Sequence, residues 1–177
     1  VAEGRRGLAV GYYRPRSHDV LDIPDCLLQP PAVTRLRAAV RAWMERCAVP
    51  AYDEKTGEGL VRHLYVRSNS RGETLVCLVV NGTHLPEEQG LVDRLCGAES
   101  GLAGVVLNMN CRNTNVILGK EYRTLWGRDW LEEELCGLTF RLSVPSFFQI
   151  NRAQTERLYQ VALDAAELTG EGTVLDL

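Results

Sequence analysis

Six cysteines are the first residues in the sequence whose side chains could do chemistry, because a thiolate is both a nucleophile and a metal ligand. They stand at positions 26, 47, 77, 96, 111 and 136, and no two of them form a CxxC pair. Cys47, Cys77, Cys96 and Cys111 lie inside apolar stretches, where a free cysteine behaves as a small hydrophobe. We therefore expect these four residues to be reduced, buried and structural.

Histidines and arginines form a second group of candidates. His18 and His63 stand in strand-like segments near aromatic or basic neighbours, and we expect a backbone carbonyl to hold each ring. Four arginines could contact phosphate groups, with a solvated charged face as the equal alternative: Arg14, Arg16, Arg62 and Arg67.

Composition limits the class of protein. The chain has 177 residues, of which 45% are hydrophobic and 24% charged, which is typical of a soluble protein with one domain or slightly more. It has neither an apolar run long enough to cross a membrane nor a signal peptide, so we expect a cytoplasmic protein. The formal net charge is −3, and charge alone disfavours nucleic-acid binding, because such proteins usually carry a basic surface.

The hydrophobic pattern predicts the elements that position these residues. Runs of strands surround two inserted helices, which predicts an α+β domain over 1–145 with a largely antiparallel sheet. The helices are expected from Pro30 to Cys47 and over 86–98. The strands are expected over 7–13, 18–23, 61–68, 73–80, 102–110, 116–119, 122–126, 130–135 and 138–142.

The pattern changes at Ser143, where the sequence reads SVPSFFQIN. Asn151 is a good N-cap for a long helix, with Gln154 placed as in a capping box and Gly170 as the stop signal. An apolar strand, TVLDL, is expected over 173–177. A helix followed by such a strand is how many nucleotide-binding α/β domains begin, so 146–177 is expected to open a truncated second domain. The expected apolar stripe of the helix is Leu158, Val161, Ala162, Ala165 and Leu168.

Three segments resemble one known family. They are VGYYRPRSHDVLDIPDC at 10–26, RHLYVR at 62–67, and SVPSFFQIN followed by the helix and VLDL. In this order they resemble the S-adenosylmethionine-dependent RNA uracil-5-methyltransferases, which make 5-methyluridine in ribosomal and transfer RNA. The resemblance implies an RNA-binding barrel, a central α+β domain and a Rossmann-like domain that binds the methyl donor. This chain would hold the central domain and the opening of the third part.

The resemblance also assigns roles to residues of the SFFQIN segment. It implies that Gln149 contacts S-adenosylmethionine, with a surface glutamine as the alternative. It places Phe147 or Phe148 near the target uracil, because extruded bases are often stacked on aromatic rings, and core packing is an equal alternative for either ring. Asp176 would close the first strand of the methyl-donor domain.

Cys26 follows the strand-like DVLDIPDC segment as the fourth cluster cysteine does in the ribosomal-RNA members of the family. The resemblance thus implies that Cys26 is one ligand of a [4Fe–4S] cluster in the full-length protein, with three ligands from upstream. A buried free thiol is the alternative. The fragment alone would bind neither the cluster nor, by expectation, the methyl donor.

The sequence therefore predicts a fragment of an RNA methyltransferase that acts on carbon 5 of a uridine, in ribosomal RNA more readily than in transfer RNA, with no DNA or membrane partner. No catalytic residue is expected in this chain, because the family's nucleophilic cysteine and general base lie beyond Leu177. The fragment is expected to be inactive. A non-enzymatic RNA-binding or scaffolding module is the rival hypothesis, and the acidic charge conflicts less with RNA binding if the barrel supplies the phosphate contacts.

Overall fold

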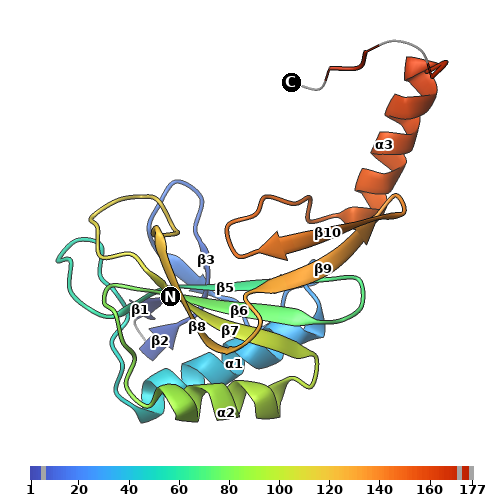
Figure 1. Ribbon diagram of the computed structural model, residues 1–177. Coiled ribbons are helices and arrows are strands. Elements are labelled where there is room, and N and C mark those ends of the chain that lie inside the picture. The colour runs from blue at the N-terminus through green and yellow to red at the C-terminus, as the bar shows by residue number, and fades with distance from the viewer. Residues whose placement is uncertain (5–6, 171–172, 176–177) are drawn as a thin grey trace.

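The computed structural model describes residues 1–4, 7–170 and 173–175. A four-stranded sheet lies over two helices, a β-hairpin rises from the sheet, and a third helix leaves the body (Figure 1). The mixed α and β content agrees with the expected fold class. None of the helices in these described stretches is long and apolar enough to cross a membrane.

The main sheet has the order β5-β6-β7-β8. Its strands are β5 (Val61–Ser68), β6 (Thr74–Val80), β7 (Leu102–Met109) and β8 (Glu121–Gly127). The outer pairs are antiparallel as expected, but β6 and β7 are parallel. Parallel neighbours need a crossover connection, and the helix between these two strands supplies it.

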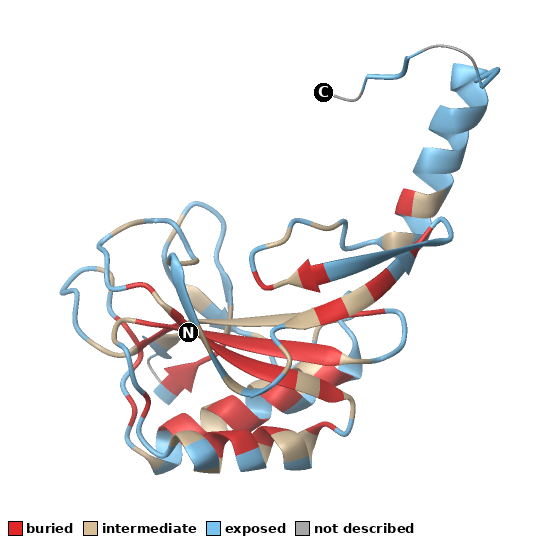
Figure 2. Ribbon diagram, viewed as in Figure 1, coloured by how far each residue is buried: buried red, intermediate tan, exposed pale blue. Residues whose placement is uncertain are grey.

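Two helices cover one face of this sheet (Figure 2). The first, α1 (Pro31–Arg46), buries Leu36, Val40 and Trp43, and the second, α2 (Glu88–Ala98), buries Leu91 and Leu95. These side chains form one core with alternate residues of the strands, as side-chain alternation in a strand requires. The two helices that the hydrophobic pattern predicted are thus confirmed.

A smaller cluster lies on the opposite face of the sheet. Outward residues of β6 and β7, such as Cys77 and Val106, pack there with Leu131 and Val144. Leu131 belongs to the antiparallel hairpin of β9 (Trp130–Leu135) and β10 (Leu138–Ser143). The hairpin covers only part of this face, so the chain leading out of β10 starts above the sheet.

The N-terminal segment forms two short antiparallel pairs. The pairs are β1 (Ala2–Gly4) with β2 (Gly7–Ala9) and β3 (Gly11–Tyr13) with β4 (Val20–Asp22). The single strand expected over 7–13 is therefore interrupted. Gly11 lies so close to the next strand that an added Cβ would meet the Leu21 carbonyl oxygen at 1.8 Å. A side chain at this position would push the 10–26 segment apart.

The expected strand over 116–119 is wrong, because these residues form an irregular loop between β7 and β8. Its backbone groups bond to side chains and not to a strand, as described below for the functional sites. The expectation that Cys111 is buried is also wrong: it opens this loop and is exposed. Cys77 is buried and Cys47 and Cys96 are half-buried, and burial raises the pKa of the Cys77 thiol to about 12.

The last helix, α3 (Arg152–Ala166), begins where the sequence predicted it. Asn151 caps it by accepting a hydrogen bond from the Gln154 amide at 3.2 Å. The expected strand over 173–177 is not formed at 173–175, where Val174 and Leu175 are exposed, since those residues find no neighbouring strand. Asp176 and Leu177 lie outside the described residues. The division into domains at residues 145 and 146 stays a prediction.

Candidate functional sites

The segment from Ser143 to Asn151 joins β10 to α3 and holds the residues expected to meet cofactor and substrate. It is anchored at its start, where Val144 is buried and the Ser146 amide donates a hydrogen bond to the Ser143 carbonyl at 3.2 Å. From the sheet, the Arg67 guanidinium donates hydrogen bonds to the Ser146 carbonyl and to the Tyr65 hydroxyl. The segment is thereby tied at one end to the sheet and at the other to the capped helix.

Between these anchors the side chains divide into two groups. Phe147 is 85% exposed and Gln149 is exposed, so both are free to meet a ligand. Phe148 instead is half-buried against Phe140, with ring centroids 5.7 Å apart. The structure therefore separates the two phenylalanines that the sequence left equal: Phe148 helps to hold the segment, and Phe147 is displayed.

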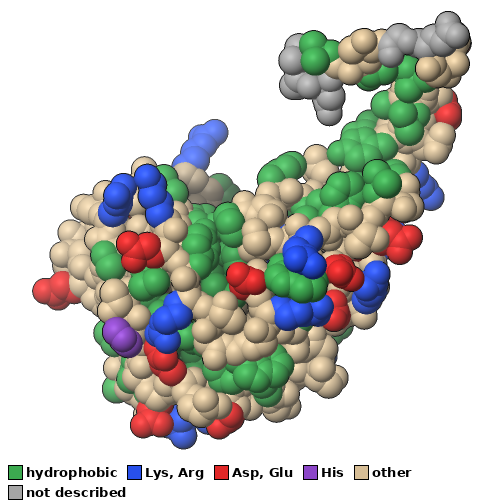
Figure 3. All heavy atoms as spheres, in the orientation of Figure 1, with side chains coloured by type: hydrophobic (Ala, Val, Ile, Leu, Met, Phe, Trp, Pro, Cys, Tyr) green, Lys and Arg blue, Asp and Glu red, His purple; other side chains and the backbone are tan. Residues whose placement is uncertain are grey.

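The apolar stripe of α3 is present but uncovered. Leu158 and Val161 are each more than half exposed, and so is Leu168, which lies just after the end of α3 and not on it as expected. Hydrophobic side chains gather along the helix in Figure 3. A contiguous exposed apolar face of this kind marks an interaction site. Within the described residues, α3 lacks the sheet that a methyl-donor domain would place against it.

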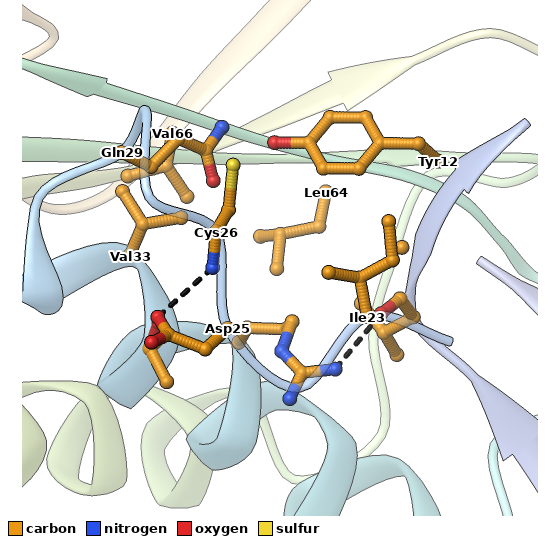
Figure 4. Close-up of a pocket in the computed structure, with 12 residues that line it drawn as sticks. Tyr12, Ile23, Asp25, Cys26, Gln29, Val33, Leu64 and Val66 are labelled. Atoms are coloured by element: carbon orange, nitrogen blue, oxygen red, sulfur yellow. Dashed lines mark hydrogen bonds between the residues drawn. The ribbon is translucent and has the colours of Figure 1, made fainter. Parts of the chain in front are cut away.

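Cys26 lies at a small cavity of about 110 Å³ beside α1. Its sulfur points toward Tyr12 and Gln29 (Figure 4), and its amide donates a hydrogen bond to the Asp25 carboxylate at 2.9 Å. Burial raises the pKa of Tyr12, and the adjacent Cys26 thiol adds to that effect. In the parts of the chain that the structure describes, no cluster of three or more histidine, cysteine or acidic residues could hold a metal ion. The ligand role of Cys26 stays a prediction, since a cluster requires several ligands.

Asp22 fixes the segment that leads to Cys26. Its carboxylate accepts hydrogen bonds from Arg37 at 3.0 Å and Arg41 at 2.8 Å, both on α1. Desolvation opposes its ionisation, but the bonds from Arg41 and the Val10 amide, and the charges of Arg41 and Arg37, outweigh it. The pKa of Asp22 is therefore lowered, and this aspartate of the 10–26 motif positions its neighbours.

Arg62 is not a surface phosphate contact, so that expectation is wrong. It is only 3% exposed, and its guanidinium lies 4.2 Å from the centroid of the Tyr52 ring. It donates hydrogen bonds to the carbonyls of Asn110 at 2.8 Å, Arg112 at 2.6 Å and Thr114 at 3.1 Å. The role of Arg62 is to shape the loop that follows β7.

The other expected contacts differ in placement. Arg14 and Arg16 are exposed, and Arg67 is half-buried at Ser146. His18 is held by the Glu54 carboxylate at 2.5 Å and not by the expected carbonyl. His63 is half-buried beside Tyr13, and desolvation, aided by nearby positive charge, lowers its pKa to about 4. The ring of His63 is therefore neutral at physiological pH.

The fold, a mixed sheet with two helices behind it and an outgoing helix in front, is found in a methyltransferase. A crystal structure of the Pyrococcus abyssi tRNA (uracil-54, C5)-methyltransferase in complex with S-adenosyl-L-homocysteine matches with a TM-score of 0.70. The match covers 86% of this chain and 37% of that one at 19% sequence identity. At that identity the match shows a shared fold.

Sequence comparison gives the family. Proteins named as uncharacterized RNA methyltransferases are 39% identical in Staphylococcus epidermidis and 37% identical in Clostridium tetani, over 94% of this chain. One from Caldanaerobacter subterraneus is 35% identical over all of it. No protein-family model matches. The chain is thus a relative of the RNA methyltransferases, which confirms the resemblance at that level, and it spans 36% to 39% of the length of these three proteins.

Proposed function

We propose that this chain is part of an enzyme that transfers a methyl group from S-adenosylmethionine to carbon 5 of a uridine in RNA, ribosomal in preference to transfer RNA. The similarity to RNA methyltransferases over 94% of the chain supports the reaction class. The observation that carries the proposal is the anchored segment that displays Phe147 and Gln149 together. An exposed aromatic ring and an amide on a braced backbone suit a site where a base meets a cofactor.

In this proposal the displayed side chains have separate tasks. S-adenosylmethionine, when bound, supplies the methyl group. Gln149 would hydrogen-bond the methyl donor through its amide, and Phe147 would stack on the target uracil, as aromatic rings do with extruded bases. Phe148 would hold the segment through Phe140.

The nucleophile is proposed to lie outside this chain. Carbon 5 of uracil is a poor nucleophile and becomes reactive when a thiolate adds to carbon 6. The chain has no cysteine between Ser143 and Asn151, and Cys77, with its pKa raised to about 12, is a poor thiolate source. We therefore expect the chain alone to transfer no methyl group.

The test of function uses the full-length protein with labelled S-adenosylmethionine and unmodified ribosomal and transfer RNA. We expect labelled 5-methyluridine in ribosomal RNA, and a loss of about 10²-fold or more in Gln149→Ala, by analogy with the loss of one positioned donor at a reacting centre. Gln154→Ala, also exposed, is the matched control and should keep full activity. RNA binding without any methyl transfer would favour the non-enzymatic binding module, and label confined to transfer RNA would reassign the substrate.

Cys26 is proposed as one ligand of a [4Fe–4S] cluster in the full-length protein, because its sulfur faces a cavity from a segment held by two arginines. Iron and sulfide should be present in that protein and fall in Cys26→Ser. Cys47→Ser, also half-buried, should leave both contents unchanged. Iron and sulfide contents in the Cys26→Ser protein equal to those of the natural protein would show that Cys26 is not a cluster ligand.

A further inference from the structure

The loop over residues 111–120, between β7 and β8, is held in one shape by buried polar side chains. Arg62 bonds to its first carbonyls, as described above. Asn110, 2% exposed, donates through its amide to the carbonyls of Val116 at 2.8 Å and Ile117 at 3.1 Å. Asn108, fully buried, donates to the Gly119 carbonyl at 3.0 Å and accepts from the Gly119 amide at 2.7 Å. Compact surface loops of this kind are frequently functional.

The buried charge of Arg62 is held by neutral groups, namely three carbonyls and the Tyr52 ring. Its partners are carbonyl groups, and within the described residues no carboxylate oxygen lies within 4.0 Å of its guanidinium. Its Nε is buried and has no hydrogen-bond partner. A buried charge is costly unless it is paired. The base of the loop therefore holds a buried positive charge that has no ion-pair partner among the described residues.

The outward side chains of the loop extend this charge to the surface. Arg112 and Lys120 are exposed, as are Asn113 and Asn115. Residues 110–120 contain no aspartate or glutamate, although the chain as a whole has a net charge of −3. The loop thus combines cations with amide groups that can bond to base edges.

The loop and the candidate site pack against the same apolar cluster. Leu118 packs on the apolar cluster that contains Val144, the first anchored residue of the segment leading to Gln149. Both the loop and this segment lie on the face of the sheet opposite α1 and α2 (Figure 1). A polyanion on the loop would lie on the same side of the sheet as Phe147.

We propose that the 111–120 loop is a preformed RNA contact, in which Arg112 and Lys120 bind phosphates and Asn113 and Asn115 face the bases of the strand near the target nucleotide. Fixing the loop before binding lowers the entropy cost of association. The buried charge of Arg62 adds a positive potential beneath the phosphates. This inference rests on the proposed function for its RNA substrate, but it concerns a surface separate from the Gln149 segment.

The test is the binding of a fluorescein-labelled single-stranded oligouridine to the chain, followed by fluorescence anisotropy at several salt concentrations. Arg112→Ala/Lys120→Ala should weaken binding by about tenfold at low salt and lower the steepness of the salt dependence by about two phosphate contacts. Arg46→Ala/Arg157→Ala removes the same charge from exposed positions on α1 and α3 and should change affinity much less. Equal losses in the two double variants would overturn the proposal, because they would show a general charge effect.

Two further measurements test this proposal separately from the alternative that the loop is an internal contact and from the proposed function. If the loop covers another part of the full-length protein instead, the loop variant will lower that protein's thermal midpoint while oligouridine affinity follows the control, and the proposal fails. Failure of the methyl-transfer assay with a preserved loop effect would refute the proposed function alone. Methyl transfer with no loop effect on RNA affinity would refute this inference alone.

Discussion

Arg67 and Ser146 join the sheet to the segment that displays Gln149. The Arg67 guanidinium, on β5, donates a hydrogen bond to the Ser146 carbonyl and a second one to the Tyr65 hydroxyl at 2.9 Å. Both sides of the contact are partly shielded from water. A residue far away in the sequence therefore sets where the segment starts, and the position of Phe147 and Gln149 depends on it.

Arg67→Ala should loosen this segment while leaving the sheet folded. It leaves the Ser146 carbonyl and the Tyr65 hydroxyl without their donor, so we expect the free energy of unfolding to fall by about 1–3 kcal/mol. Amide hydrogen exchange should accelerate over 146–151. Arg157→Ala, on an exposed position of α3, is the control and should change neither. Unchanged exchange at 146–151 in Arg67→Ala would show that β10 and α3 alone hold the segment.

Arg62 should matter for stability and not only for binding. Arg62→Ala leaves three carbonyls without a donor and opens a cavity above Tyr52, which we expect to cost about 3 kcal/mol or more of unfolding free energy. Arg62→Lys keeps the charge but lacks the planar fork that reaches several carbonyls, so it should recover only part of the loss. Urea denaturation gives both values. Arg16→Ala, at an exposed arginine, is the matched control and should lower the unfolding free energy only slightly. An equally small loss in Arg62→Ala would show that Arg62 contributes no more to stability than a surface cation.

The sequence predicted the elements that repeat a clear pattern. The apolar faces of α1 and α2, the β5–β6 hairpin and the Asn151 cap follow from local spacing, because each depends on residues close in sequence. It did not predict the role of Arg62 or the loop after β7. Those depend on contacts between residue 62 and residues 110–114. The sequence alone does not show whether an arginine is buried or solvated. Asn108 and Asn110, each in or beside an apolar strand, were the available signal.

The placement of the candidate site follows the same division. Asn151 and the change of pattern at Ser143 gave the position of the segment in the chain. Local pattern could not separate Phe147 from Phe148, because the difference comes from Phe140 on the neighbouring hairpin. The strand expected at 173–177 fails at 173–175 for a related reason, since a strand needs a partner and the described residues offer none there.

The ion pairs of Asp22 with Arg37 and Arg41 should make the free energy of unfolding depend on pH under acidic conditions. The folded pKa of Asp22 is lowered, so its contribution is present above the unfolded value, about 3.9, and is lost as pH falls through the folded pKa. The difference in unfolding free energy between the natural chain and Asp22→Asn should therefore be constant near neutral pH and shrink at strongly acidic pH. Denaturation of both proteins across this range measures it. If the difference in unfolding free energy stays constant down to the lowest pH, the charge of the Asp22 carboxylate does not contribute to stability.

The uncovered stripe of α3 gives the last prediction. Leu158 is 62% exposed, whereas Leu36 on α1 is fully buried. In this chain Leu158→Ala should change the unfolding free energy by no more than about 0.5 kcal/mol, while Leu36→Ala should cost about 2–5 kcal/mol. If α3 opens a methyl-donor domain, Leu158→Ala in the full-length protein should become costly, because the domain's sheet would then bury the side chain. Urea denaturation of both variants in both proteins makes the comparison, and an inexpensive Leu158→Ala in the full-length protein would mean that no sheet covers the helix.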